Sequence, residues 1–284
     1  MPSRPLPGLP TTQKLESVIF VAKTWGPGTT LKVCFIEDSD AGPRQAIALY
    51  ASEWTKWGSV KFDFGPPPSL RTCLPNDGVN IRITFRTDGY AAYVGKDALA
   101  EAAQNEPTVF LKDFDSENFT SEVYKGIVIH EFGHVLGFAH EHQSPATNCQ
   151  SQFDIDAIKR AYGWDDAQVE VNILRINVSH AFQVGPSFTS ATGNEGPIDF
   201  TKYDPKSVMH YALPVEIFKQ PPGSCFIAEA NNELSDLDKK GVSFAYPNIT
   251  TASFNAKHNA VIDQLAASKQ VSTMERKALV ILKR

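Results

Sequence analysis

Residues 130–142 read His-Glu-Phe-Gly-His-Val-Leu-Gly-Phe-Ala-His-Glu-His, a stretch with two histidines four positions apart and a third six positions later. On a helix, His130 and His134 project from the same face about one turn apart, so that both can reach a single metal ion. Glu131 stands beside the first histidine, where the general base of a zinc hydrolase is needed. The stretch therefore predicts a helix that carries a metal site.

Gly137, the second glycine of this stretch, allows a third ligand. Gly137 can adopt a left-handed turn without a Cβ clash, so the helix can end there and the chain can double back toward His140. A His-Glu-x-x-His pattern alone arises by chance in many chains, but the added glycine and third histidine remove most such accidents. Three neutral nitrogen donors with one open position are typical of a catalytic zinc site. We predict one catalytic Zn²⁺ held by His130, His134 and His140.

Composition limits the classes of function. The chain has 284 residues, is 42% hydrophobic and can bury a full core. A net charge of -5 and the absence of a sustained Lys/Arg run argue against nucleic acid as a partner. No stretch reaches the roughly 18 consecutive apolar residues of a membrane span. The sequence does not determine the oligomeric state, and a monomer is the default expectation.

Cysteine use and the N-terminus bear on the compartment. Four cysteines allow two disulfides in any of three pairings, and they are equally consistent with buried free thiols. Three Asn-x-Ser/Thr triplets permit glycosylation of an exported chain, whereas no signal peptide is recognisable at the N-terminus. We expect a secreted protein, with a cytoplasmic one as the alternative. The four cysteines are Cys34, Cys73, Cys149 and Cys225.

Periodicity predicts a sheet and two helices before residue 140. Tyr50, Trp54 and Trp57 recur at helical spacing and are interpreted as core. Ser121 is a suitable cap for the helix that carries the first two histidines. The predicted strands are 31–36, 60–64, 79–85, 90–95 and 108–112, and the predicted helices are 43–58 and 122–136.

The pattern is less regular after residue 142. Asp154 and Gly163 bound a short helix, and Ser235 with Asp238 forms a capping-box pattern that opens another helix, which Pro247 ends. Residues 171–178 read as irregular or extended. We expect a flexible leader at 1–14, a catalytic domain at 15–247 whose N-lobe reaches about residue 140, and a helical tail at 248–284 with one or two amphipathic helices in 255–284.

A second motif, Ser207-Val208-Met209-His210-Tyr211, reveals a family resemblance. With the zinc motif, it resembles the astacin-like zinc peptidases of the metzincin clan. The resemblance implies that Met209 lies in a tight turn beneath the three histidines. It also implies that Tyr211 is a switchable fifth zinc ligand. Without the family, Met209 would read as core filler and Tyr211 as a half-buried surface ring.

The resemblance covers roughly residues 25–247 and implies a fold. It predicts an α+β, metzincin-like, two-lobed protein. The N-terminal lobe holds a twisted, mostly parallel sheet with helices, the C-terminal lobe is irregular and mainly helical, and zinc lies on the floor of the cleft between them. Residues Tyr93, Val94 and Gly95 resemble the edge strand that holds an extended substrate in this family.

One segment departs from the animal members of the family. Those enzymes continue past the glutamate after the third histidine with a run of arginine and aspartate, whereas residues 141–145 read Glu-His-Gln-Ser-Pro, closer to microbial and fungal relatives. In the animal enzymes that glutamate, here Glu141, meets the new N-terminus of the processed protein. We interpret His142 as a surface residue, and His210 as a histidine satisfied by hydrogen bonds.

The implied function is a zinc-dependent endopeptidase that acts on proteins or peptides. Glu131 would be the general base, and Tyr211 would donate to the oxyanion. Two alternatives stay open: a catalytically inactive zinc-binding interaction or inhibitory protein on the same scaffold, and a zinc hydrolase for substrates other than peptides. The presence of Glu131 speaks against the first, and the methionine turn speaks against the second.

Overall fold

The computed structural model describes residues 18–20, 23–116, 119–174, 180–184, 187–192, 196–200 and 202–248, with single positions at 256, 259 and 263. The predicted leader at 1–14 lies outside these residues. So do the predicted helices of 255–284, apart from the three single positions. Among the described residues, no helix combines the length and apolar character that a membrane crossing requires.

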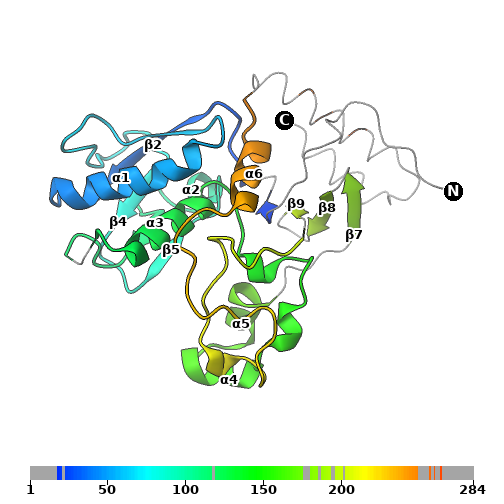
Figure 1. Cartoon of the computed structure of the whole chain (residues 1–284). Coiled ribbons are helices and arrows are strands. Elements are labelled where there is room, and N and C mark those ends of the chain that lie inside the picture. The colour runs from blue at the N-terminus through cyan, green and yellow to red at the C-terminus, as the bar shows by residue number, and fades with distance from the viewer. Residues whose placement is uncertain are drawn as a thin grey trace.

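A five-stranded sheet forms the centre of the first lobe (Figure 1). Its inner strand β4 (Ile81–Thr84) is buried along its whole length, as expected of a parallel strand covered on both faces. All neighbours pair in parallel except β5 (Tyr90–Ala92), which runs antiparallel to β6 (Val109–Leu111) at one edge. The predicted α+β class with a mostly parallel sheet is confirmed. The strand order is β3 (Lys61–Asp63), β2 (Thr30–Phe35), β4 (Ile81–Thr84), β6 (Val109–Leu111) and β5 (Tyr90–Ala92).

Two helices, α1 (Ala41–Thr55) and α3 (Glu122–Val135), lie side by side against this sheet (Figure 1). The backbone N–H of Tyr124 donates to Ser121 Oγ, so the predicted cap of α3 is confirmed. Trp54 is fully buried, whereas Trp57 is 43% exposed because α1 ends before it. The interpretation of Trp57 as core is therefore wrong. A short helix, α2 (Asp97–Ala100), follows β5.

The main hydrophobic core lies between the sheet and these two helices, and it includes residues within 234–246, later in the chain. Helix α6 (Asp236–Ala245) returns to this lobe, where Val242 and Tyr246 are fully buried. Ser235 and Asp238 form the predicted capping box at its start. The metal helix α3 is thus packed from several directions.

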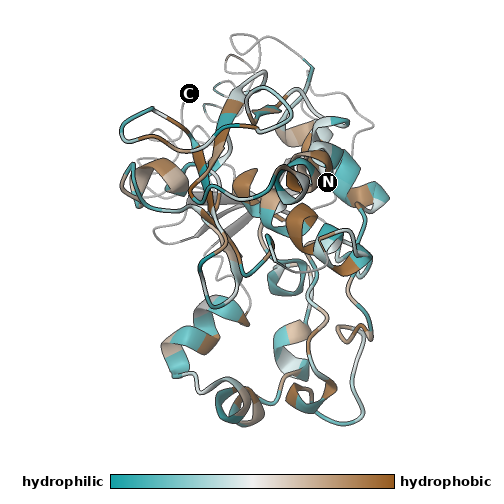
Figure 2. Cartoon of the chain, turned by 90° about the vertical axis from the view of Figure 1, so that its left-hand side faces the viewer, coloured by the Kyte–Doolittle hydropathy of each residue, from teal (hydrophilic) through white to brown (hydrophobic). Residues whose placement is uncertain are grey.

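The second lobe is built around a smaller core near residues 149–226 (Figure 1). Helix α4 (Ile155–Tyr162) begins after Asp154 and ends at Gly163, as predicted. Helix α5 (Asp166–Asn172) was not predicted, and residues 171 and 172, expected to be irregular or extended, belong to it. Both helices mix hydrophilic and hydrophobic residues (Figure 2). Three 3₁₀ helices complete the lobe: η2 (Glu141–Gln143), η3 (Cys149–Gln152) and η4 (Val215–Ile217).

A second, antiparallel sheet was not predicted: three of its strands follow residue 140, in the part expected to be mainly helical, and in Figure 1 they lie apart from α4 and α5. Its order is β1 (Ile19–Phe20), β9 (Gly196–Phe200), β8 (Ser187–Thr192) and β7 (His180–Val184). Strand β1 also contacts the turn after α3, because the N–H of Phe20 donates to the carbonyl of Gly137 at 3.0 Å.

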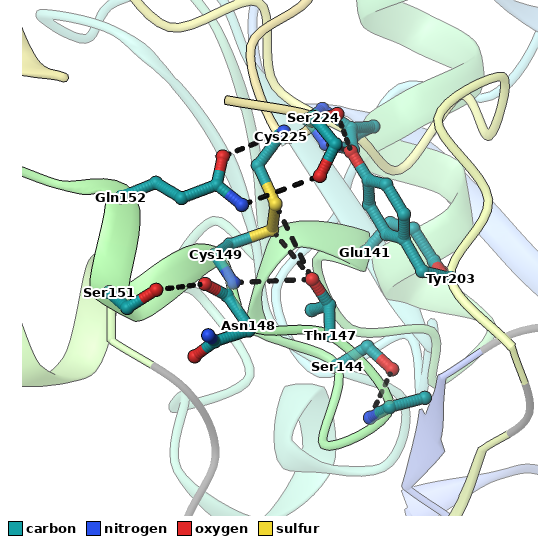
Figure 3. The surroundings of a disulfide bond; sticks show 12 residues. Glu141, Ser144, Thr147, Asn148, Cys149, Ser151, Gln152, Tyr203, Ser224 and Cys225 are labelled. Atoms are coloured by element: carbon teal, nitrogen blue, oxygen red, sulfur yellow. Dashed lines mark hydrogen bonds between the residues drawn. A yellow bond between two sulfur atoms is a disulfide. The ribbon is translucent and has the colours of Figure 1, made fainter. Parts of the chain in front are cut away.

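The cysteines form two disulfides, Cys34–Cys73 and Cys149–Cys225. The first joins β2 to the loop before β4, and the second closes the small core of the second lobe (Figure 3). This resolves the pairing that the sequence left open and excludes free thiols at these four positions.

Candidate metal centre

The end of α3 is fixed by aromatic donors from distant parts of the chain. Trp25 Nε1 donates to the carbonyl of Val135 at 2.7 Å, and the hydroxyl of Tyr246 donates to the carbonyl of Leu136 at 2.6 Å. The last carbonyls of a helix have no partner within it, so these contacts satisfy them without water. The helix therefore ends at a defined point beside its second histidine.

The turn at Gly137 brings the third histidine back to the helix. Gly137 has a φ of +95°, and its N–H donates to the carbonyl of His134 at 2.8 Å. Only glycine adopts such a backbone at no steric cost. The predicted left-handed turn is confirmed, and it carries His140 to the face of α3 that bears the other two imidazoles.

The side chains of His130, His134 and His140 converge. Their potential ligand atoms all lie within 4.8 Å of one another, and Nε2 of His134 is 3.0 Å from Nε2 of His140. Among the described residues, this is the one group of His, Cys, Asp and Glu side chains with spacing suited to a metal ion. The structure thus brings together the three residues that the sequence singled out as ligands.

Each imidazole makes a second contact through its Nδ1 atom. His130 Nδ1 lies 2.8 Å from the carbonyl of Val208, and His134 Nδ1 lies 2.9 Å from the carbonyl of Phe138. His140 Nδ1 lies 3.1 Å from Oε1 of Gln143. All three partners accept, so this network assigns the proton to Nδ1 and leaves the Nε2 lone pairs for the centre. Metal-ligating histidines are held in the same way.

The donor set fits zinc. Nε2 of His130 is buried and has no hydrogen-bond partner among the described residues, and the facing lone pairs of His134 and His140 repel unless a cation lies between them. Burial lowers the pKa of His130 to about 3 and that of His134 to about 4, so both imidazoles are neutral at pH 7. Neutral nitrogen ligands of this number are those of catalytic zinc sites.

Glu131 is buried beside the three imidazoles. It is 3% exposed, its Oε2 has no hydrogen-bond partner, and burial raises its pKa to about 8. A dication nearby would favour the ionised carboxylate and oppose that shift. The arrangement suits a group that accepts and returns a proton.

The methionine turn packs against the helix between its first two histidines. Met209 is 1% exposed, and a Cβ on Gly133 would collide with its sulfur atom. The turn is anchored to α6, because Ser207 Oγ donates to Asp238 Oδ1 at 2.6 Å and the N–H of Val208 donates to Asp238 Oδ2 at 2.9 Å. The carbonyl of the same Val208 accepts from His130 Nδ1, so α6 supports the orientation of this histidine through the methionine turn.

Tyr211 lies over the imidazoles. Its ring centroid is 4.1 Å from that of His140 and 5.0 Å from that of His130. Burial, and then the charge of Glu131, raise the pKa of Tyr211, so its phenol keeps its proton at neutral pH. The hydroxyl is thus available as a donor.

A cavity of about 210 Å³ opens beside Glu131 and Tyr211. Apart from the site residues, its wall is neutral, with apolar side chains and two asparagines. The walls come from α3, from β5 and from the segments that follow the methionine turn. The residues around it are Tyr90, Val123, Gly126, Ile127, His130, Glu131, Val208, His210, Tyr211, Ala212, Ala230, Asn231 and Asn232.

The predicted edge strand is shorter than expected. Strand β5 ends at Ala92, so Tyr93, Val94 and Gly95 lie beyond it. The chain bends there because the N–H of Gly95 donates to the carbonyl of His134 at 2.9 Å, which draws it toward the end of α3. The exposed sheet edge near the site is β5 itself.

The structure also corrects the interpretation of the segment after His140. His142 is 1% exposed, so the prediction of a surface residue is wrong. His210 is satisfied as expected, with Nε2 2.6 Å from the hydroxyl of Tyr203. Glu141 is buried and accepts from the N–H of Asp204 at 2.9 Å, and burial raises its pKa well above the usual range.

Sequence reasoning did not single out two residues that support the site, Gln143 and Asp238. The Ser235-to-Asp238 spacing predicted a helix cap, which the structure confirms, but the same carboxylate also holds the methionine turn. Gln143 had one indication in the sequence, its position three residues after His140. That spacing brings side chains together only in a helical turn.

Comparisons with known proteins agree with this geometry. The sequence model of the astacin family of peptidases matches residues 19–235. Tolloid-like protein 1 of Homo sapiens and that of Mus musculus are each 29% identical over 134 residues, which is 46% of this chain and 10% of the relative's length. The chain therefore spans only a small part of these curated relatives.

Solved structures of myroilysin share the fold. One is 24% identical with a TM-score of 0.62, covering 82% of this chain and 100% of that chain. A second is 25% identical with a TM-score of 0.52, covering 80% and 86%. The two-lobed, metzincin-like fold is thus confirmed. Because the family match extends over most of its length, this chain belongs to the astacin family of peptidases.

Proposed function

We propose that the chain is a zinc-dependent endopeptidase in which His130, His134 and His140 hold one zinc ion through Nε2. The observation that carries the proposal is the 3.0 Å approach of Nε2 of His134 to Nε2 of His140, near a buried carboxylate oxygen of Glu131 that has no hydrogen-bond partner among the described residues. A cation bound between these atoms would stabilise the centre. Membership of a peptidase family supports peptide bonds as the target.

A zinc ion bound there would lower the pKa of its water toward ~7 and polarise a carbonyl. Glu131 takes a proton at its carboxylate as water attacks the peptide carbonyl, and returns it to the departing amine nitrogen. One proton thus moves from water to the leaving group, and the C–N bond breaks after the new C–O bond has formed. The raised pKa of Glu131 matches this double role.

Tyr211 assists the same step. Its protonated hydroxyl donates to the oxyanion that forms on the peptide carbonyl. Its position over His130 and His140 supports this role. As a fifth zinc ligand in the resting enzyme, as the family resemblance implies, it would turn away when substrate binds.

An extended peptide would lie along β5, the strand at the edge of the sheet, with main-chain hydrogen bonds that set its position rather than its sequence. We assign this edge to residues 90–92, in place of the Tyr93–Gly95 segment expected from the sequence. The 210 Å³ cavity beside Glu131 would take a neutral side chain next to the cleaved bond. Substrate choice would rest on that cavity.

Two further proposals concern the cellular location of the protein and its relationship to other members of the family. Two disulfides support an oxidising, extracellular location. The sequence of residues 141–145 supports a closer kinship with microbial and fungal members than with animal astacins. The buried contact of Glu141 with the N–H of Asp204 supports a structural role for this glutamate.

One experiment tests the function against both alternatives. Purified protein is incubated with a mixed peptide library and with denatured casein, with and without a zinc chelator. We expect internal cleavage that the chelator abolishes and added zinc restores. Zinc binding without cleavage would instead favour the two alternatives, an inactive zinc-binding protein or a zinc hydrolase for other substrates. Absence of zinc binding would overturn the proposed site altogether.

A further inference from the structure

The third ligand is held differently from the other two. His130 and His134 give their Nδ1 protons to main-chain carbonyls, which belong to Val208 and Phe138. His140 instead meets a side chain, Oε1 of Gln143, at 3.1 Å. A substitution cannot remove a main-chain carbonyl, but it can remove the side-chain amide of Gln143. The orientation of His140 therefore depends on the identity of one residue.

The local backbone places this amide. Residues Glu141–Gln143 form the 3₁₀ helix η2, in which the N–H of Gln143 donates to the carbonyl of His140 at 3.1 Å. Side chains three positions apart eclipse one another in a 3₁₀ helix. Gln143 consequently lies on the same side of this turn as His140, and it is 6% exposed.

The far end of the amide is anchored as well. Gln143 Nε2 donates to the carbonyl of Leu174 at 3.1 Å, just beyond helix α5. Because the NH₂ group is used there, the amide oxygen must face His140, and the proton of His140 must sit on Nδ1. The neighbouring His142 contacts the carbonyl of Asn172 at 3.3 Å, so two adjacent side chains join η2 to the end of α5.

We propose that Gln143 is a positioning residue for the metal centre: its amide fixes the tautomer and ring orientation of His140 and ties the third ligand to the end of α5. This inference rests on the proposed zinc site and goes beyond it, because it assigns the third ligand a partner of its own. Partners of this kind typically change metal affinity 10- to 100-fold when removed.

The chain offers a matched control. Gln152 also lies in a 3₁₀ helix of the second lobe, and its amide also bridges two segments. Its Oε1 accepts from the N–H of Cys225 at 3.0 Å, and its Nε2 donates to Ser224 Oγ at 3.4 Å (Figure 3). It contacts none of the three histidines. Loss of this bridge removes comparable hydrogen bonds without touching the metal centre.

The test measures zinc affinity of the full chain by competition with a fluorescent chelator. Gln143→Met, which keeps the length and loses both polar groups, should bind zinc about 10- to 100-fold more weakly than the parent. Gln152→Met should stay within about threefold of it. Long-range ¹H–¹⁵N NMR of the metal-free protein should show the His140 Nδ1 proton in the parent and its loss in Gln143→Met.

A third variant separates positioning from simple stability. Gln143→Glu keeps the acceptor for His140 but loses the donor to Leu174, so its metal-free form should melt at a lower temperature while its zinc affinity stays at least equal to the parent's. If Gln143→Met does not fold, the zinc affinity of Gln143→Glu still tests the inference. Unchanged affinity in Gln143→Met, equal losses in both methionine variants, or a tenfold loss in Gln143→Glu would each overturn the inference. A parent that binds no zinc would instead overturn the proposed function.

Discussion

The Nε2 atoms of His134 and His140 lie 3.0 Å apart. Each imidazole directs its Nδ1 proton to another acceptor, the carbonyl of Phe138 in one case and the amide oxygen of Gln143 in the other. Burial also keeps the pKa of both histidines well below neutrality, so protonation does not relieve the repulsion at pH 7. The fold holds this arrangement in place through the turn at Gly137.

The first prediction concerns removal of the metal. Because the repulsion between these lone pairs is relieved by a cation, chelation should lower the melting temperature of the protein. Zinc at a thousand times its dissociation constant would stabilise the fold by about 4 kcal/mol. Calorimetry with and without chelator measures the change, and added zinc should reverse it. Added magnesium should not reverse the change, because Mg²⁺ prefers oxygen ligands. An equal melting temperature in all samples would contradict the prediction.

The second prediction concerns Glu131. Glu131→Gln preserves the shape of the side chain but cannot accept the proton of the attacking water, so kcat on casein should fall by about 10² to 10⁴. Zinc content and melting temperature should stay close to the parent's, because the residue is not one of the three nitrogen ligands. Cleavage at the parent's rate by a zinc-loaded variant would exclude Glu131 as the base.

The third prediction separates Tyr211 from substrate binding. Tyr211→Phe keeps the ring over His130 and His140 but removes the hydroxyl, so stabilisation of the oxyanion is lost while ring packing remains. We expect kcat to fall about 10- to 100-fold with little change in KM, since the lost contact belongs to the transition state. Steady-state kinetics on one peptide suffices. A larger change in KM than in kcat would assign the hydroxyl to ground-state binding.

The sequence predicted the metal helix and most of the sheet because these depend on short-range patterns. The spacing of His130 and His134, the glycine at 137 and the cap at Ser121 are each local, and each appears in the structure. The supports of the site are not local. Asp238 reaches Val208 across thirty positions, and Trp25 reaches Val135 across more than a hundred, which no periodicity encodes.

The sequence was least informative where element ends depend on tertiary contacts. Strand β5 stops at Ala92 because Gly95 is drawn to the carbonyl of His134, and a single-strand pattern contains no trace of that bond. Sheet β1-β9-β8-β7 joins the start of the chain to its third quarter, so its pairing was equally hidden. His142 carries a polar side chain and yet is buried, because the end of α5 covers it.

The fourth prediction concerns pH and Asp238. Burial raises the pKa of Asp238 to about 6, above its ordinary value of 3.8, so the folded protein binds a proton more tightly than the unfolded chain. Stability contributed by the protonated form is therefore present below pH 4 and is lost as the pH rises to about 6. At about 1.36 kcal/mol per unit of pKa difference, this loss is of the order of 3 kcal/mol.

Urea unfolding of the parent and of Asp238→Asn between pH 4 and pH 7.5 tests this point. The asparagine variant mimics the protonated side chain and should lack the decline in unfolding free energy that Asp238 contributes. Asp236→Asn is the matched control, because Asp236 lies on the same helix with its side chain 88% exposed. Parallel pH profiles for the parent and Asp238→Asn would show that the carboxyl group is not the source.

The fifth prediction concerns substrate choice at the cavity beside Glu131. Val123 stands on its rim, is 60% exposed and belongs to the first turn of α3. Val123→Arg places a cation at a wall that is otherwise neutral, so peptides with an acidic residue next to the cleaved bond should gain about threefold to fivefold in kcat/KM over neutral ones. That factor corresponds to an exposed charge pair of about 1 kcal/mol or less.

Leu49→Arg, on α1 and 63% exposed, adds the same charge away from the cavity and should change neither peptide's rate. A gain in both variants would indicate long-range attraction by net charge, and no gain in Val123→Arg would mean that the cavity does not hold the side chain next to the cut.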